Sequence, residues 1–322
     1  MAELGKSVLK GEGITKVFGY GKTRTVAVDH VDFDFREGEV ISIVGESGSG
    51  KTTIARMILG LIGITEGSLE FNGQPRDISS GKKRKEYWKN IQAVFQDPFS
   101  SFNMFNKIDD LLLDCINMTG GKHLPKEKKD ELMTEACSFV NLKYAELTNK
   151  YPFELSGGMQ QRLNIALSIM FSPALLIMDE ATTALDVVTQ GQILDELMEM
   201  EKTMSITRLM ITHDLSVVEH ISDTVGVMYL GSLVEYGSTE DIFRHPLHPY
   251  TEALFSAIPI PDPKAKMNRI VLEGSIPSPA NPPAGCKFHT RCAHCMERCK
   301  VEEPVQREVE PGHFVVCHLY DK

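Results

Sequence analysis

The chain has 322 residues, and aspartate and glutamate outnumber lysine and arginine, which leaves a net charge of −10. The length suggests two domains, or one large domain with an extension. The acidic balance argues against a protein whose main partner is a nucleic acid. The sequence contains no apolar run close to the roughly 18 residues of a membrane-spanning helix. The first ten residues lack the apolar stretch of a secretory signal, so we expect neither a membrane span nor export.

Short apolar runs alternate with helical patterns along most of the chain, which predicts an α/β fold with a parallel sheet. The runs considered as strands are 42–44, 174–178, 208–212 and 225–230. Between about residues 97 and 172 the pattern is mostly helical, with a charged break from Lys122 to Asp130. We therefore expect a helical subdomain inserted into the sheet domain.

From about residue 241 the sequence becomes rich in proline, which predicts a long irregular connector. We expect a sheet domain in residues 1–240 and a C-terminal extension in residues 241–322. Five of the seven cysteines lie in the last 37 residues. Such clustering in a chain without a secretory signal favours a metal or cluster site over a disulfide framework.

The segment after the first apolar run fits the phosphate-binding pattern G-x-x-x-x-G-K-[ST], between a predicted strand and a predicted helix. It consists of Gly45, Glu46, Ser47, Gly48, Ser49, Gly50, Lys51 and Thr52, and Thr53 follows in the helix. The glycines allow backbone N–H groups to approach phosphate oxygens, and the helix N-terminus favours negative charge. We expect Lys51 to reach the β- and γ-phosphates and Thr52 to bind Mg²⁺.

An acidic pair, Asp179 and Glu180, follows the second apolar run. Ligands of α/β sheets bind at the carboxyl ends of the strands, where this pair is expected to lie. Asp179 suits the hold on Mg²⁺, and Glu180 suits a base that polarises the attacking water. His213 follows the third run, and at this edge of the sheet we expect it to contact a γ-phosphate and hold the attacking water.

The segment Leu155–Gln160 precedes a helical pattern and reads LSGGMQ. Ser156, Gly157 and Gly158 offer a hydroxyl and N–H groups at a helix N-terminus, which makes a second anion site. With the phosphate loop, the Asp-Glu pair and His213 in this order, the segment resembles the signature loop of ABC ATPases. The resemblance implies two chains packed head to tail, in which each signature loop, including Gln160, caps the ATP of the other chain.

Three further positions follow from this resemblance. Gln96 matches the Q-loop, which contacts Mg²⁺ and joins the nucleotide to the helical subdomain. Thr183–Asp186 matches the D-loop, which places Asp186 at the interface between two ATPase chains. Phe18, or alternatively Tyr20, matches the aromatic residue that stacks on adenine.

The segments 245–251, 285–292 and 313–319 are similar to the connector and extension of the oligopeptide/dipeptide/nickel importer ATPases. This resemblance implies an ATP-hydrolysing subunit at the cytoplasmic face of the cell membrane. Its implied partners are two transmembrane permease subunits, a homologous ATPase subunit in a heterodimer, and an extracytoplasmic substrate-binding protein. Oligopeptides or dipeptides are the expected cargo. Nickel chelates, oligosaccharides and a soluble, non-transport ABC ATPase remain as alternatives.

Four cysteines match the pattern of that extension: Cys286, Cys292, Cys299 and Cys317. The resemblance implies a [4Fe–4S] cluster, which takes four thiolates. Tetrahedral Zn²⁺ also accepts four thiolates, and Cys295 offers an additional ligand at a C-x₂-C spacing. The residues alone leave the cluster, zinc and metal-free thiols open.

Overall fold

The computed structural model describes residues 5–97, 103–182, 186–203, 206–258 and 269–321. The chain forms two compact units. The helical unit comprises residues 1–5 and 77–210, and the phosphate-loop unit comprises residues 6–76 and 211–322. Within the described ranges, no helix combines the length and the apolar character needed to cross a bilayer.

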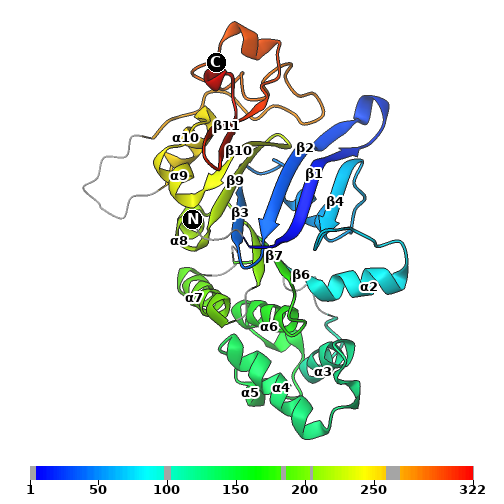
Figure 1. Ribbon diagram of the computed structural model, residues 1–322. Coiled ribbons are helices and arrows are strands. Elements are labelled where there is room, and N and C mark those ends of the chain that lie inside the picture. The colour runs from blue at the N-terminus through cyan, green and yellow to red at the C-terminus, as the bar shows by residue number, and fades with distance from the viewer. Residues whose placement is uncertain (1–4, 98–102, 183–185, 204–205, 259–268, 322) are drawn as a thin grey trace, which may run out of the picture. The chain divides into compact units, whose positions relative to one another are not determined.

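The helical unit has three strands in the order β8, β7, β6, of which β7 and β6 run parallel. They are β6 (Ile91–Phe95), β7 (Leu175–Asp179) and, at the boundary between the units, β8 (Thr207–Ile211). The helices are α2 (Gly81–Asn90), α3 (Ile108–Met118), α4 (Lys126–Phe139), α5 (Tyr144–Leu147), α6 (Gly157–Ile169) and α7 (Val187–Thr203), with short 3₁₀ turns at Gly121–His123 and Pro152–Glu154. In Figure 1, α6 has the strands β6 and β7 on one side and the helices α3, α4 and α5 on the other.

One helix boundary differs from the sequence expectation. The break predicted from Lys122 to Asp130 ends at Pro125, and α4 starts at Lys126. Charged residues are compatible with a helix whose outer face is in solvent. Exposed Lys128 and Glu131 form an ion pair one turn apart on this face, with 2.8 Å between Nζ and Oε2.

The phosphate-loop unit contains an antiparallel sheet and a second group of strands. The antiparallel sheet has the order β2 (Thr25–Arg36), β1 (Ser7–Phe18), β4 (Glu66–Phe71) and β5 (Gln74–Pro75). The second group has the order β11 (Gln306–Glu310), β12 (His313–Val316), β10 (Ser232–Ser238), β9 (Thr224–Tyr229) and β3 (Val40–Val44). Here β3 runs parallel to β9, while β9, β10, β12 and β11 pair antiparallel.

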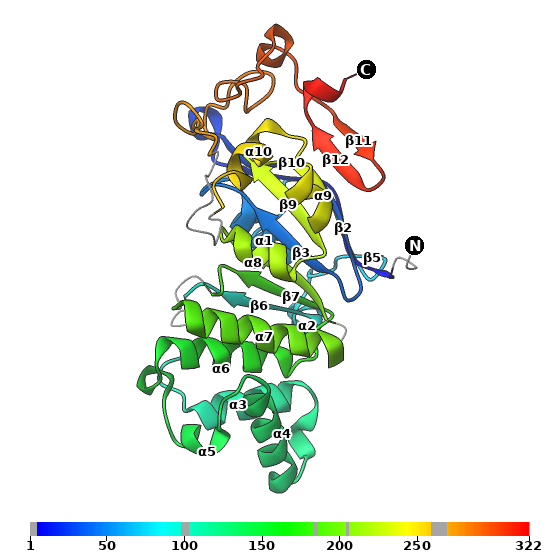
Figure 2. The same cartoon turned by 90° about the vertical axis from the view of Figure 1, so that its left-hand side faces the viewer.

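The helices of this unit are α1 (Lys51–Ile58), α8 (Leu215–Ile221), α9 (Thr239–Arg244) and α10 (Pro249–Phe255), with 3₁₀ turns at Gly21–Thr23, Glu297–Lys300 and His318–Tyr320. In Figure 2, α8, α9 and α10 lie on one face of β3, β9 and β10. Apolar residues of these elements form one buried cluster, in which Val44 at the end of β3 and Phe288 of the C-terminal extension both take part. The extension therefore shares a hydrophobic core with the strand that leads into the phosphate loop.

The proline-rich connector is more ordered than its composition predicts. Pro249 stands in the first turn of α10, where its missing N–H leaves no bond unmade. His248 caps this helix by accepting a bond from the Tyr250 N–H at 3.0 Å. Burial lowers the pKa of His248 to about 4, so its ring stays neutral and able to accept. The prediction of an irregular connector is wrong for residues 249–255.

Candidate functional site

The loop from Gly45 to Gly50 connects β3 to α1, as the sequence pattern predicts. Gly50 caps the helix with φ +109°, and a Cβ there would lie 2.4 Å from the Ala27 carbonyl oxygen. At Gly45, a Cβ would lie 2.2 Å from the Met228 oxygen. Only glycine fits at either position, because neighbouring backbone occupies the space of a side chain. The loop is thus held against the strands by close backbone packing.

The Lys51 side chain is buried and lies along this loop. Its ammonium donates to the backbone oxygens of Gly45 at 2.8 Å and Glu46 at 3.0 Å. Thr52 and Thr53 follow in the first turn of α1 and are partly exposed. A buried ammonium beside the N-terminus of a helix is a strong attraction for an anion.

The acidic pair and the predicted Q-loop residue come from neighbouring strands of the helical unit. Strands β6 and β7 are in parallel register, with Phe95 opposite Asp179. Gln96 and Glu180 therefore follow directly at the same edge. Asp179 is buried, whereas Glu180 is half-buried with φ +50°. A non-glycine residue in this strained conformation is a recurring feature of functional sites.

The signature segment opens α6. Ser156 is its N-cap, and the Ser156 hydroxyl accepts from the Met159 N–H at 3.4 Å. Gly157 is exposed, and among the described residues a Cβ there would meet no atom within 4 Å, so the space beside it is open. Gln160 is buried, and its amide donates to the oxygens of Pro152 and Leu155 at 2.9 and 3.2 Å. Its described bonds hold the loop from inside.

Gln161, which the sequence reasoning did not single out, links three parts of this unit. From α6, its side-chain amide donates to the Phe95 oxygen at 3.3 Å and to the Ala181 oxygen at 2.5 Å. These acceptors directly precede Gln96 and directly follow Glu180. Gln161 thus ties the signature helix to both residues. A second glutamine beside the signature was the only sequence signal for it.

The remaining predicted positions are spread over both units. Phe18 ends β1 in the phosphate-loop unit and is partly exposed. The Lys16 ammonium lies over its ring, 4.9 Å from the ring centre. His213, exposed, follows β8. Asp186 accepts from the Thr189 N–H and hydroxyl, which lowers its pKa. The other residues of the predicted D-loop, 183–185, lie outside the described part of the chain.

The four predicted cysteine ligands gather in the C-terminal extension. The Cys286 N–H donates to the Cys299 oxygen at 2.8 Å, which joins the first and third of them. Burial raises the pKa of Cys317 to about 11, and the neighbouring thiols Cys286, Cys292 and Cys299 add to the rise through charge repulsion. Among the described residues, no three or more histidine, cysteine, aspartate or glutamate side chains form a group that could hold a metal ion.

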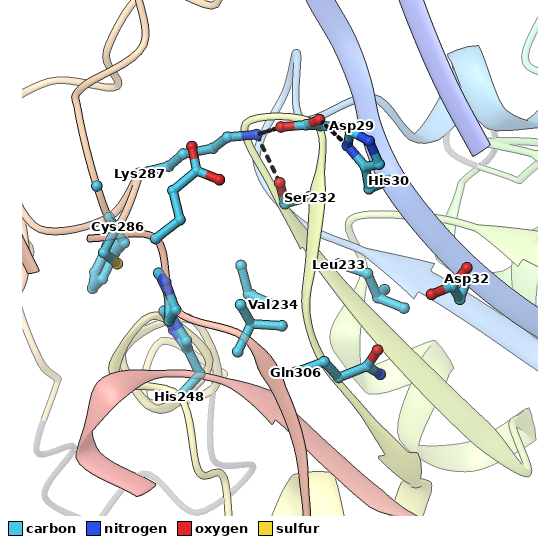
Figure 3. A pocket seen from close by; sticks show the side chains of 15 residues that line it. Asp29, His30, Asp32, Ser232, Leu233, Val234, His248, Cys286, Lys287 and Gln306 are labelled. Atoms are coloured by element: carbon cyan, nitrogen blue, oxygen red, sulfur yellow. Dashed lines mark hydrogen bonds and ion pairs between the residues drawn. The ribbon is translucent and has the colours of Figure 1, made fainter. Parts of the chain in front are cut away.

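A cavity of about 290 Å³ lies where the extension meets β2 and β10 (Figure 3). On its rim the Lys287 ammonium contacts the carboxylate of Asp29 at 2.6 Å and the hydroxyl of Ser232 at 2.7 Å. Burial favours a higher pKa for Asp29, but its bonds to Lys287 and His30 outweigh burial and lower it. Lys287 thus fastens the extension to both strands.

A glycine loop that opens a helix occurs in many nucleotide-binding folds. The additional serine–glycine loop, at the start of a helix in a separate helical unit, narrows the class to ATP-binding cassettes. Residues 28–183 match the family model described as ABC transporter, and residues 234–299 match the model of the oligopeptide/dipeptide transporter C-terminal region.

The chain is 44% identical over 297 residues to the oligopeptide transport ATP-binding protein AppF of Bacillus subtilis, covering 91% of this chain and 89% of AppF. Two solved structures share the fold. The first, cbiO1 of Clostridium perfringens, part of the ABC transporter complex cbiONQ, has a TM-score of 0.65 and 28% identity over 74% of this chain and 92% of its own. The second is the dimeric cassette MJ0796 bound to ADP and Pi, with a TM-score of 0.65 and 26% identity over 72% and 98%.

The chain belongs to the oligopeptide/dipeptide branch of the ABC transporter ATP-binding proteins. It has the P-loop ABC ATPase fold expected from the sequence, with a sheet that is mixed rather than wholly parallel. It is an ATPase, and this class of enzyme uses ATP with Mg²⁺.

Proposed function

We propose that this chain hydrolyses ATP to power the import of oligopeptides or dipeptides. One observation carries the proposal: the region that matches the oligopeptide/dipeptide transporter model packs in the same core as the strand that leads into the phosphate loop. The similarity to AppF, which extends over nearly the whole chain, supports the same assignment. We further propose a boundary near residue 240 between the cassette, with its helical subdomain at about 97–172, and the extension.

The proposed partners follow from this role. Two transmembrane permease subunits would carry the cargo, an extracytoplasmic binding protein would deliver it, and a homologous ATPase subunit would pair with this chain at the cytoplasmic face of the membrane. The exposed signature glycine, Gly157, supports pairing because the space beside it is open among the described residues. Asp186, which follows the segment 183–185, would lie at this interface.

At the nucleotide, we assign the phosphates to the loop from Gly45 to Thr53, with Lys51 neutralising the β- and γ-phosphates. Thr52, Gln96 and Asp179 would hold Mg²⁺, and Phe18 would stack on adenine. Ser156, Gly157 and Gly158 would cap the ATP of the partner subunit, and Gln160 would keep their loop in shape.

Hydrolysis requires a water molecule to attack the γ-phosphate. We assign Glu180 to polarise that water by accepting its proton and His213 to hold it near the γ-phosphate. The helical unit would respond to hydrolysis of the γ-phosphate, because Gln161 bonds to the backbone beside both Gln96 and Glu180. Conversion of ATP to ADP would then shift α6 and the helices packed on it.

Uptake measurements test the proposed cargo. In cells lacking this chain, uptake of a labelled tripeptide should fall to background and return with the wild-type chain but not with Lys51→Ala. Uptake of a free amino acid by an unrelated transporter is the control. Unchanged tripeptide uptake, with loss of nickel-chelate or oligosaccharide uptake, would refute peptide import and support one of the alternatives.

We also propose a [4Fe–4S] cluster on Cys286, Cys292, Cys299 and Cys317. Four thiols are the donor set that such a cluster takes. Burial is the main cause of the raised pKa of Cys317, and the thiols of Cys286, Cys292 and Cys299 lie near enough to add to it. Each iron binds one thiolate, so the sulfurs need not converge on a single point. The cluster would act as a structural staple for the extension.

Metal analysis of protein purified without oxygen tests this assignment. About four irons per chain and broad absorbance near 400 nm are expected for one cluster. Cys299→Ser should lose both, whereas Cys115→Ser, in the helical unit, should retain them. A single zinc, or no metal, would contradict the cluster and leave the ATPase assignment untouched.

A further inference from the structure

Glu46, the second residue of the phosphate loop, is held by two residues from the C-terminal part of the chain. Its backbone N–H donates to the Tyr250 hydroxyl at 2.9 Å. Its carboxylate accepts two bonds from Arg291, at 2.7 Å from Nη1 and 3.0 Å from Nη2. This two-pronged geometry fixes the direction of the carboxylate as well as its position.

The ion pair is largely removed from water. The Arg291 side chain is 7% exposed and that of Glu46 is 27% exposed. The guanidinium carbon lies 5.8 Å from the centre of the Tyr229 ring, which covers one side of it. Removing one partner from such a pair leaves the other charge poorly solvated, which makes a partly buried pair matter more than a surface one.

Arg291 is held rigidly by its own surroundings. The backbone N–H of Arg291 donates to the backbone oxygen of Phe288 at 2.9 Å. The Phe288 ring is buried in the unit's core, edge-on to Tyr229 with 5.2 Å between ring centres. Lys287, which directly precedes Phe288, is bonded to Asp29 and Ser232. The turn from Lys287 to Arg291 is therefore held in place, and with it the position from which the guanidinium reaches Glu46.

A carboxylate in a loop that binds phosphate poses an electrostatic problem, because like charges repel over the few ångströms of such a site. The Lys51 ammonium, which supplies the loop's attraction for anions, also donates to the Glu46 backbone oxygen at 3.0 Å. Arg291 offsets the negative charge of Glu46, and together with Tyr250 it fixes the backbone on which Lys51 rests.

We propose that Arg291 is a positioning residue of the phosphate site, which neutralises and orients Glu46 so that the C-terminal extension forms part of the ATP-binding apparatus. This inference rests on the proposed assignment of Gly45–Thr53 to the phosphates. It gives the extension a role in nucleotide affinity that does not depend on the identity of any metal bound there.

The test measures the dissociation constant for MgATP on the full-length chain. Arg291→Ala should weaken binding about tenfold, which is less than the loss seen when a partner of a buried charge pair is removed directly, because Arg291 acts on the phosphates only through Glu46. Lys300→Ala is the matched control, because Lys300 adjoins Cys299 as Arg291 adjoins Cys292 but pairs with Glu297 on the surface. Its affinity should equal that of the wild type.

A second substitution separates the charge from general damage to the fold. If the unpaired carboxylate repels the phosphates, Glu46→Gln in the Arg291→Ala background should recover most of the lost affinity. A purely structural role would predict that the double variant binds no better than Arg291→Ala. Wild-type affinity in Arg291→Ala, or no recovery in the double variant, would overturn the proposal.

Two further arms keep the outcome unambiguous. Where Arg291→Ala does not fold, Arg291→Met replaces it, since methionine keeps a long apolar side chain at this buried position and removes the guanidinium with its charge and its two bonds to Glu46. The same loss and the same recovery by Glu46→Gln are expected. Lys51→Ala tests the phosphate assignment itself, because undiminished ATP binding by this variant would refute that assignment. If Lys51→Ala loses ATP binding but the Arg291 variants bind ATP normally, only the inference about Arg291 is refuted.

Discussion

Lys51→Ala should weaken MgATP binding at least about hundredfold and reduce hydrolysis in proportion. Hydrogen bonds to charged groups contribute about 1.5–3 kcal/mol each, and about 2.8 kcal/mol corresponds to a hundredfold change in affinity. The Lys51 ammonium already lies within the loop, 2.8 Å from the Gly45 oxygen, so little rearrangement is needed to reach a phosphate. Equilibrium titration with MgATP measures the effect.

The control for this substitution is Lys128→Ala, which removes an exposed lysine paired with Glu131 on the outer face of α4. It should bind ATP as the wild type does. A thermal melt is also required, because Lys51 bonds to its own loop and its loss could loosen that loop. ATP binding by folded Lys51→Ala at wild-type affinity would rule out the phosphate loop as the nucleotide site.

Glu180→Gln should bind ATP normally but turn it over about a hundredfold more slowly, or worse. Glutamine has the shape of glutamate but cannot accept a proton from the attacking water, and loss of a general base typically costs a factor of about 10²–10⁴. The strained backbone of Glu180, with φ +50°, should survive this isosteric change. The expected result is therefore a fall in kcat with an unchanged dissociation constant.

Glu219→Gln on α8 is the comparison, because this glutamate is exposed and belongs to none of the proposed nucleotide contacts. It should hydrolyse ATP at the wild-type rate. If Glu180→Gln retained full turnover, the role of general base would have to move to another group, and Glu180 would be left as a structural residue.

The sequence predicted those features whose signals are local. The phosphate loop lies within eight consecutive residues between a strand and a helix, so its pattern and its context can be read together. The same holds for Ser156 before α6 and for the acidic pair after β7. In each case the chemistry is determined by neighbours in sequence, and the structure places the residues in the expected elements.

Features that depend on contacts distant in sequence could not be predicted. Arg291 and Glu46 are 245 positions apart, and nothing near either residue points to the other. Gln161 resembles any polar helical residue until β6 and β7 are placed beside it. At Pro249, the high proline content of the segment predicted an irregular connector where α10 begins. Proline disfavours a helix interior but suits the first turn, and the start of α10 is marked only by the His248 cap.

The discontinuous make-up of the phosphate-loop unit has a consequence for synthesis on the ribosome. The loop emerges early, whereas Tyr250 and Arg291 are made 204 and 245 residues later. At roughly 5–20 residues per second, the interval before Arg291 lasts about 12–50 seconds. Throughout that time the nascent chain carries the phosphate loop without its contact to Arg291. If Arg291 positions Glu46 as proposed, a product truncated before Arg291 would retain the phosphate loop but bind ATP more weakly than the whole chain.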